Sequence, residues 1–433
     1  MGKRIVLSRS AVRFTLHHWR SVIVATLLLG CGESTTAVGT EATNMPDLDA
    51  SSVTSKANHA VDVPIPGVSQ DWVAEFNRGD PLFDVVLRDA DGLGPLYTRQ
   101  ACSSCHDGAL RGAGFVQKMS VVQADGVTPD PDQSELPFGH TIHPFTAGGA
   151  QKPILAPSAS NIRLSARFGP PVLGRGYLEA ILDEEIVAVA AAQANASGSI
   201  HGRINHVVYA SQPNADTRFH SHQPGDSVIG RFGVKARVAT LDDFAADAMQ
   251  GDMGITSPLR PSEIPNPDNQ TDDLKLGIDA TFDDVNQRAN YTRLLAIPAR
   301  RLPSGNGQAL FAQVQCATCH VPSLRTRPDY PIEVLADIDA PVYTDLLLHD
   351  MGDDLADGLR ETDGEAGARD WRTAPLIGLK YLTTYLHDAR AKSLRDAVLL
   401  HDSNGSEAHD SIAQFLQLSD SDQQTLLNFI EAL

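Results

Sequence analysis

Two short stretches of the chain combine cysteines and a histidine at a spacing that can attach a cofactor. Residues 102–106 read CSSCH and residues 316–320 read CATCH. The C-x-x-C-H spacing is typical of covalent haem attachment, in which two thiols bond to the porphyrin and the histidine becomes an axial ligand of the iron. We therefore predict two c-type haems. The predicted attachment cysteines and proximal histidines are Cys102, Cys105 and His106 for the first haem, and Cys316, Cys319 and His320 for the second.

Other uses of paired cysteines fit these stretches less well. A C-x-x-C redox pair needs no histidine after it, and a structural zinc site needs four nearby ligands. A disulfide across so short a loop would be strained. The chain has 5 cysteines, and the two motifs use all of them except Cys31.

The elements that must position these motifs repeat along the chain. The segment PVLGRGYL at 171–178 aligns with PLIGLKYL at 375–382. Further on, VKARVATLDDFAADAM at 234–249 aligns with HDARAKSLRDAVLLHD at 387–402. Two haem-bearing halves of one ancestral unit, a pseudo-twofold repeat, explain this pattern better than a solenoid of many repeats.

The expected fold class is mainly α, with two haem-bearing domains of short helices joined by long loops. Thr240 and Ser393 each precede a run of acidic and apolar residues, which is typical of a helix start with a hydroxyl N-cap. We expect an N-terminal haem domain over 71–300, with an insertion after Leu178, and a C-terminal haem domain over 301–433. The boundary falls in the Pro- and Gly-rich stretch AIPARRLPSGNGQ.

The two halves differ on the final helix of the repeat. In register, His401 of the second half lies opposite Ala248 of the first. His401 is therefore the expected sixth ligand of the second iron, and the alternative is a surface histidine at a helix end. A saturated iron suits electron transfer, whereas the first iron, held by His106, would keep an open or weakly held face for a small oxidant.

Splitting an O–O bond at that open face requires a proton donor. Asp252 is the favoured acid because it lies in the stretch MQGDMGIT, which directly follows the position that lacks a histidine, although a helix-end carboxylate is the alternative. Arg237 and Arg390 occupy matching positions in the two halves, where they could pair with haem carboxylates. We place Arg237 with Asp252 in the catalytic site and Arg390 on a haem propionate, against the alternative of surface arginines. Further candidate distal ligands of the first iron are His140, His143, Met249 and Met253.

The N-terminal residues have the layout of a bacterial export signal. Residues 1–20 carry several Lys and Arg and no acid, and the apolar run SVIVATLLLG follows. This predicts a lipoprotein-type signal peptide over 1–30, a lipidated Cys31 and a flexible tether over 31–70. The apolar run is too short to span a membrane. A plain signal peptide with an incidental cysteine is the alternative.

The overall charge limits the partners. The 433-residue chain has a net charge of −19 and 42% hydrophobic residues. An acidic protein does not favour nucleic acid or an anionic membrane surface, so we expect membrane contact only through the N-terminal lipid. A basic protein partner is compatible with this charge, and so is a homodimer.

Several segments resemble the bacterial di-haem cytochrome c peroxidase superfamily, and more closely its di-haem oxidoreductase branch. Besides both C-x-x-C-H motifs, they are GRFGVKARVATLDDFAADAMQGDMGITSP, LLLHDMGDDLADG and YLHDARAKSLRDAVLLH. The resemblance runs from about Trp72 to the C-terminus. It implies two cytochrome c-like haem domains, in which the first haem reacts with peroxide and the second passes electrons to it.

The resemblance also implies individual site residues. The distal methionine that the peroxidases place on the second haem falls on His401, and their distal glutamate corresponds to Asp252. Their calcium ion, bound largely by backbone carbonyls, would lie near 382–384. Two departures stand out: the tryptophan between the family's haems corresponds to Val234, and the family motif HDG reads HDA at Ala389.

The expected activity is reduction of hydrogen peroxide to water in the periplasm, with the protein anchored to the outer membrane by its lipid. Gly32 after the cysteine favours that membrane by resemblance to bacterial lipoproteins. A small periplasmic cytochrome c or copper protein would donate the electrons. The alternatives are a di-haem oxidase or oxygenase acting on an organic or protein substrate, and a non-enzymatic electron-transfer cytochrome.

Overall fold

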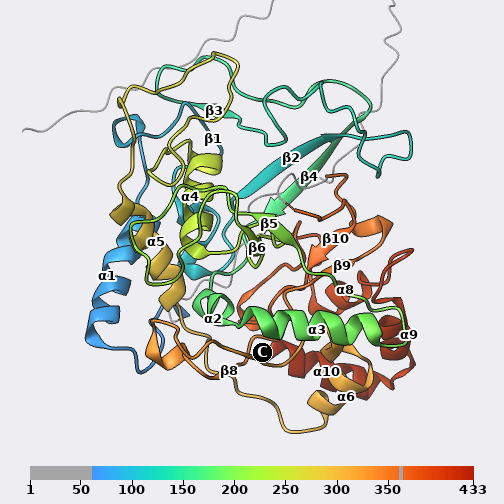
Figure 1. Ribbon diagram of the computed structural model, residues 1–433. Helices are drawn as coiled ribbons and strands as arrows, with labels where there is room; N and C mark the ends of the chain where they lie inside the picture. The colour runs from blue at the N-terminus through green and yellow to red at the C-terminus, as the bar shows by residue number, and fades with distance from the viewer. Residues whose placement is uncertain (1–60, 360–363) are drawn as a thin grey trace, which may run out of the picture. The chain divides into compact units, whose positions relative to one another are not determined.

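The computed structural model describes residues 61–359 and 364–433 (Figure 1). The predicted signal peptide, Cys31 and the tether up to residue 60 lie outside the described residues. Residues 61–70 do not continue the tether, because Val61 and Ile65 are each only 3% exposed within the hydrophobic core. The packed chain therefore already includes residue 61, and the predicted tether is too long.

The expectation of a mainly α fold is wrong. Helix accounts for 32% of the structure and strand for 14%, so the secondary structure is mixed. The helices are α1 (Gln70–Asp84), α2 (Arg175–Ala180), α3 (Asp183–Asn195), α4 (Leu241–Met253), α5 (Phe282–Leu294), α6 (Gly307–Gln313), α7 (Cys316–Cys319), α8 (Leu394–Leu399), α9 (His409–Gln417) and α10 (Asp420–Glu431).

The strands form small antiparallel pairs instead of one large sheet. The β2–β4 pair is the longest and joins Phe115 to Phe168 at one end and Val121 to Ile162 at the other. The pairs are β1 (Leu96–Tyr97) with β3 (Phe145–Thr146), β2 (Phe115–Val121) with β4 (Ile162–Phe168), β5 (His206–Val208) with β6 (Ser227–Ile229), β7 (Leu324–Arg325) with β8 (Asp339–Ala340), and β9 (Leu348–Asp350) with β10 (Asp370–Arg372).

The internal repeat is visible in the backbone. Thr240 and Ser393 cap α4 and α8 in the same way, each hydroxyl accepting a hydrogen bond from the backbone N–H three residues later. Ala236 and Ala389, which align in the sequence, both adopt a positive φ, at 52° and 62°. Such values are rare for a residue with a side chain, so their recurrence at matched positions supports a common origin.

The matched segments around Gly174 and Gly378 agree as well. Both glycines adopt a left-handed conformation, with φ of 67° and 71°, and both precede a short helical turn. The backbone differs just before the attachment motifs. Leu96–Tyr97, which ends five positions before Cys102, is strand β1, whereas Leu310–Phe311, which ends five positions before Cys316, lies in helix α6.

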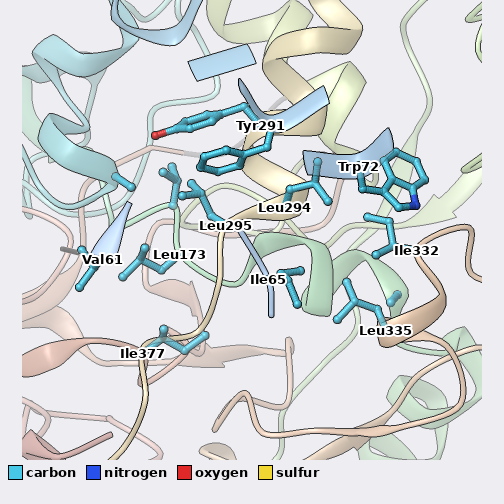
Figure 2. Close-up of a cluster of buried hydrophobic side chains, with 14 of the residues drawn as sticks. Val61, Ile65, Trp72, Leu173, Tyr291, Leu294, Leu295, Ile332, Leu335 and Ile377 are labelled. Carbon is cyan, nitrogen blue, oxygen red and sulfur yellow. The ribbon is translucent and has the colours of Figure 1, made fainter. Parts of the chain in front are cut away.

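One hydrophobic core cluster joins the two expected haem domains (Figure 2). Tyr291, Leu294 and Leu295 come from α5 and the residue after it, while Ile332, Leu335 and Ile377 come from beyond residue 300. All six are at most 3% exposed. The division into domains 71–300 and 301–433 stays a prediction, and the core does not separate at that boundary.

A buried group of charges ties α2, α4 and α5 together. Arg293 of α5 is 1% exposed and donates to both oxygens of Glu179 on α2, at 2.6 and 3.1 Å. Its guanidinium also reaches Asp242 of α4 at 3.3 Å. Tyr330, from the second half of the sequence, donates to Glu179 at 2.8 Å. These contacts fix the orientation of α4, which carries Asp252.

Across residues 61–359 and 364–433, none of the helices has the length and apolar character needed to cross a bilayer.

Removing the Arg293 guanidinium would leave Glu179 and Asp242 as buried carboxylates without that partner. We expect Arg293→Ala to lower the free energy of unfolding by about 3–5 kcal/mol, because uncompensated buried charge is costly. Urea denaturation followed by far-UV circular dichroism measures this change. The exposed Arg301 offers a matched control, and Arg301→Ala should stay within about 0.5 kcal/mol of the parent protein. Equal midpoints for both variants would contradict this role.

Candidate functional site

In the first C-x-x-C-H motif, one ring nitrogen of the histidine, Nδ1, is already used in a hydrogen bond. Cys102–Ser104 forms a 3-10 turn, and Cys102 and Cys105 are free thiols that are partly exposed. The Nδ1–H of His106 donates to the carbonyl of Pro170 at 2.8 Å. This bond fixes the tautomer and the ring orientation and leaves Nε2 as the nitrogen that can ligate a metal.

The second motif repeats this arrangement. Cys316–Cys319 forms α7, both thiols are free, and His320 donates from Nδ1 to the carbonyl of Tyr343 at 3.1 Å. Burial lowers the pKa of His106 and of His320 to about 4 in each case. Both imidazoles are therefore neutral at pH 7, which is the form that binds iron.

A cavity of about 290 Å³ opens beside the second motif, and its lining is largely apolar. Cys316, Cys319 and His320 line it, and so does His401. The charge of His401 lowers the pKa of His320, so the two rings lie near each other. His401 donates from Nδ1 to the carbonyl of Ala397 at 2.7 Å, which leaves its Nε2 free as well. The structure thus brings together the two histidines predicted to share the second iron.

The position of His401 differs in one respect from the expectation. Helix α8 ends at Leu399, so His401 lies in the turn after the helix and not on it. The aligned α4 continues for thirteen residues to Met253. Helix α8 is shorter than α4, but the imidazole of His401 still lines the cavity.

Three buried arginines, Arg111, Arg175 and Arg372, line the same cavity. Burial lowers their pKa values to about 10, 9 and 10, and for Arg175 the nearby charge of Arg372 adds to the effect. Arg111 Nε and Arg175 Nη1 are buried and have no hydrogen-bond partner in the described part of the chain. Unmatched N–H donors with positive charge suit a bound anion, and haem carboxylates supply that chemistry.

The arginines singled out from the repeat are placed elsewhere. Arg390 donates to Asp388 and to the carbonyl of Asp354, and it does not line the cavity. The expectation that it holds a haem propionate is not supported. Arg237 forms an ion pair with Asp247 of α4. Neither Arg111 nor Arg372 belongs to a segment aligned in the repeat, so no sequence signal marked them.

Asp252 lies beside the first motif. Its carboxylate contributes to raising the pKa of both Cys102 and Cys105, which places it near the two thiols. Burial raises the pKa of Asp252 to about 6, and Asp247 adds to the rise while Lys118, Arg237 and Arg99 oppose it. A carboxyl group with this pKa can both hold and release a proton near neutral pH.

The backbone at Asp252 is held by the segment that leads into the first motif. Its carbonyl accepts from the N–H of Thr98 at 2.7 Å, from the N–H of Arg99 at 3.2 Å and from the Thr98 hydroxyl at 3.1 Å. These bonds couple the end of α4 directly to residues just before Cys102. The carboxyl group therefore keeps its position relative to the attachment site.

The other residues predicted as distal ligands of the first iron are two histidines and two methionines. His143 is 4% exposed and donates from Nε2 to the carbonyl of Gly251 at 2.7 Å, next to Asp252, and its buried Nδ1 has no partner among the described residues. His140 bonds to the carbonyl of Met119. Met249 and Met253 belong to a hydrophobic cluster against which Cys102 packs, so their side chains serve as core there.

A tryptophan that sequence reasoning did not mark lines the cavity beside Val234. Trp371 stacks on His387 with ring centroids 3.6 Å apart and an interplanar angle of 13°. The N–H of the next residue, Arg372, donates to the carbonyl of Val234 at 2.9 Å. An indole from β10 thus lies near Val234, the position where the resemblance implies a tryptophan.

The implied calcium site near 382–384 is not supported. The carbonyl of Thr384 accepts a hydrogen bond from Arg111 Nη1 at 3.1 Å, and the carbonyl of Leu386 accepts one from Arg111 Nη2 at 3.0 Å. These carbonyl oxygens therefore already accept hydrogen bonds from the positively charged Arg111 guanidinium, which disfavours a calcium ion there.

A second group of polar side chains lies against Cys319. Cys319, Asp345 and His349 have ligand-type atoms within 4.8 Å of one another. His349 is held between two carboxylates, Asp345 at 2.9 Å on Nε2 and Glu407 at 2.7 Å on Nδ1. Both ring nitrogens are engaged and Cys319 belongs to the attachment motif, so this group supports the second site and is not a separate metal site.

Comparison with solved structures finds only distant similarity. The diheme peroxidase BthA from Burkholderia thailandensis shares 14% sequence identity, with 88% of this chain and 89% of that chain covered and a TM-score of 0.39. Hydrazine synthase from Kuenenia stuttgartiensis shares 14% identity, with 93% and 100% covered and a TM-score of 0.37. These scores are too low to establish a common fold. No curated protein sequence matches the chain.

A family profile gives the firmer result. The profile described as "Di-haem oxidoreductase, putative peroxidase" matches residues 156–433. The match includes the second motif, the cavity histidines His320 and His401, and Asp252, while the first motif precedes it. On this evidence the chain belongs to the di-haem oxidoreductase family, whose members carry two haems.

Proposed function

We propose that this protein is an exported di-haem peroxidase that reduces hydrogen peroxide to water. The observation that carries the proposal is Asp252, a carboxyl group with a pKa of about 6 beside the thiols of the first attachment motif. The net reaction consumes one peroxide, two protons and two electrons and yields two waters. Protons must therefore be delivered next to the first haem, and Asp252 is positioned to deliver them.

The chain's residues fit the haems that the family implies. Haem iron, when bound, supplies one-electron redox chemistry and a place for peroxide to react. Neutral His106 and His320 present Nε2 as proximal ligands because their Nδ1 atoms are engaged by carbonyls. His401 would present its Nε2 at the second site, and the buried arginines Arg111 and Arg175 would receive haem carboxylates through their unmatched N–H groups.

The two sites then divide the work. At the second site, His320 and His401 would both be available to ligate the iron of a bound haem, and an iron held by two histidines would suit electron transfer and leave no place for a small oxidant. At the first site, Asp252 in its protonated form gives a proton to the departing oxygen, and Lys118 and Arg99 favour its return to the charged form. Burial and Asp247 raise the pKa of Asp252, and nearby positive charges lower it, so the pKa is about 6.

Electron delivery and location complete the proposal. The −19 net charge favours a small periplasmic donor with a basic docking face, either a cytochrome c or a copper protein. Export and lipidation at Cys31 would locate the protein in the periplasm, anchored to the outer membrane. Both statements rest on the N-terminal sequence pattern and the charge.

The assignment of His401 predicts a spectroscopic change. In the His401→Ala variant the second iron loses its sixth ligand, so one low-spin ferric signal should convert to high-spin while the signal of the first haem stays as it was. Electron paramagnetic resonance of the as-isolated protein measures both. His409 is a matched control because it is exposed and pairs with Asp402, and His409→Ala should leave both signals unchanged. Unchanged signals in His401→Ala would overturn the assignment.

The role of Asp252 predicts a loss of turnover with a changed pH profile. Asp252→Asn removes the titrating proton and should lower kcat for peroxide by about a hundredfold or more. The protonated fraction of a group with a pKa of about 6 falls as pH rises, so parent activity should decline above pH 6. The variant should lack that decline. Steady-state kinetics with a reduced small donor, from pH 5 to 8, gives both results.

A matched control and the competing activities are tested in the same assay. Asp283→Asn changes an aspartate of α5 outside the site, and it should keep parental kcat and pH dependence. Turnover with dioxygen and an organic substrate, but not with peroxide, would replace the peroxidase by an oxidase or oxygenase. If both haems are low-spin and react with neither peroxide nor carbon monoxide, the protein is a non-enzymatic electron-transfer cytochrome.

A further inference from the structure

A histidine beside the second attachment motif has a carboxylate on each of its ring nitrogens. His349 is 2% exposed, and its Nε2 lies 2.9 Å from Oδ2 of Asp345, while its Nδ1 lies 2.7 Å from Oε2 of Glu407. The same Nδ1 lies 3.7 Å from Sγ of Cys319, the atom that would attach the second haem. His349 and Glu407 also line the cavity of the second site. The imidazole is therefore in direct contact with the point of haem attachment.

Segments that are distant in the sequence hold the imidazole in this position. His349 lies in β9 and Asp345 just before it, whereas Glu407 lies between α8 and α9. Gln193 of α3 closes the group, because its amide donates to Oδ2 of Asp345 at 2.9 Å. A Cβ at Gly202 would lie 2.6 Å from Cε1 and 2.8 Å from Nε2 of His349, so a glycine is needed for the backbone to pack against the ring. The ring therefore has a fixed orientation between the two carboxylates.

The hydrogen bonds indicate that His349 carries a positive charge. Oδ1 of Asp345 accepts from the N–H of Leu347 at 2.9 Å. Oε1 of Glu407 accepts from the N–H of Asp350 at 3.1 Å. Carboxylates that accept from several N–H groups are stabilised in the ionised form, which has no proton to donate. Both ring nitrogens of His349 must then be donors, and only the imidazolium has two N–H groups.

The pKa of Glu407 agrees with this charge. Burial would raise that pKa, but the hydrogen bond and the charge of His349 outweigh burial and lower it. Glu407 is therefore ionised at neutral pH, as a carboxylate that accepts from an imidazolium.

We propose that the imidazolium of His349, held between Asp345 and Glu407, sets the reduction potential of the second haem. Two carboxylates and one imidazolium leave a single net negative charge beside the attachment sulfur. Negative charge stabilises the oxidised iron, which carries one more positive charge than the reduced iron, and so lowers the potential. The imidazolium limits this effect because it offsets one of the two carboxylates.

The inference rests on the proposed function, since it requires a haem at the second motif that passes electrons to the first. Such a haem needs a potential that lets it accept electrons from the donor and release them again. His349 would take no part in the peroxide chemistry. It is a positioning residue that acts on the iron through the charge and the hydrogen bonds around Cys319.

Redox titration of the full-length holoprotein at pH 7, followed by the visible absorbance of the low-spin second haem, tests the proposal. His349→Gln removes the positive charge and should move the midpoint potential to a lower value. Glu407→Gln removes a negative charge and should move the midpoint potential to a higher value. Shifts of opposite sign are the signature of charge, because a loss of packing has no reason to change sign between the two variants.

An exposed histidine provides the matched control. His206 lies in β5 and does not line the cavity. His206→Gln should keep the parental potential, since water and salt screen an exposed charge. If one of the first two variants fails to incorporate haem, His349→Asn or Asp345→Asn makes the corresponding comparison. Parental potentials in both charge variants, or shifts of the same sign, would overturn the proposal.

The same samples separate this inference from the proposed reaction. Peroxide turnover together with unmoved potentials refutes the role of His349 alone. Opposite shifts in a protein that does not turn over peroxide support that role and refute only the reaction.

Discussion

The structure depends on the buried ion pair between Arg293 and Glu179. Two N–H groups of one guanidinium meet both oxygens of one carboxylate, with Asp242 alongside and Tyr330 completing the hydrogen bonds. Burying these charges is unfavourable unless every partner is in place, so the pair specifies one arrangement of α2, α4 and α5. Asp252 lies on α4, and Gly174, at the start of α2, follows closely on Pro170, which accepts from His106. A single buried network therefore determines where the first site's acid and histidine lie.

The two attachment motifs use the same local device. In each, a backbone carbonyl from a distant segment receives the Nδ1–H of the histidine, and burial keeps the ring neutral. The two sites then differ in the side chains that lie close to each motif. His401 approaches the second histidine, whereas a carboxyl group with a pKa near 6 lies at the first. The repeat thus preserved the proximal side of each site, and substitution on the other side created the difference that the proposed reaction needs.

The cavity arginines illustrate how tertiary structure reassigns charged residues. Arg237 and Arg390 are equivalent in the repeat, which predicted that they would pair with haem carboxylates. In the structure both pair with nearby aspartates. Arg111, Arg175 and Arg372 come from separate segments and converge on one cavity. Arg111 also donates to the carbonyl of Thr384, where the family resemblance implied calcium.

The sequence by itself determined the covalent chemistry and the repeat. The C-x-x-C-H spacing specifies haem attachment locally, and the capping hydroxyls of Thr240 and Ser393 specify two helix starts within a few residues. It also pointed to His401 and Asp252, because their positions follow from alignment of the halves. It did not predict the strand pairs or the shared core, since residues such as Leu294 and Ile332 meet only when the chain folds. The arginines of the cavity and the stacking of Trp371 on His387 were likewise decided by tertiary structure alone, because burial and convergence depend on contacts between segments that no local pattern encodes.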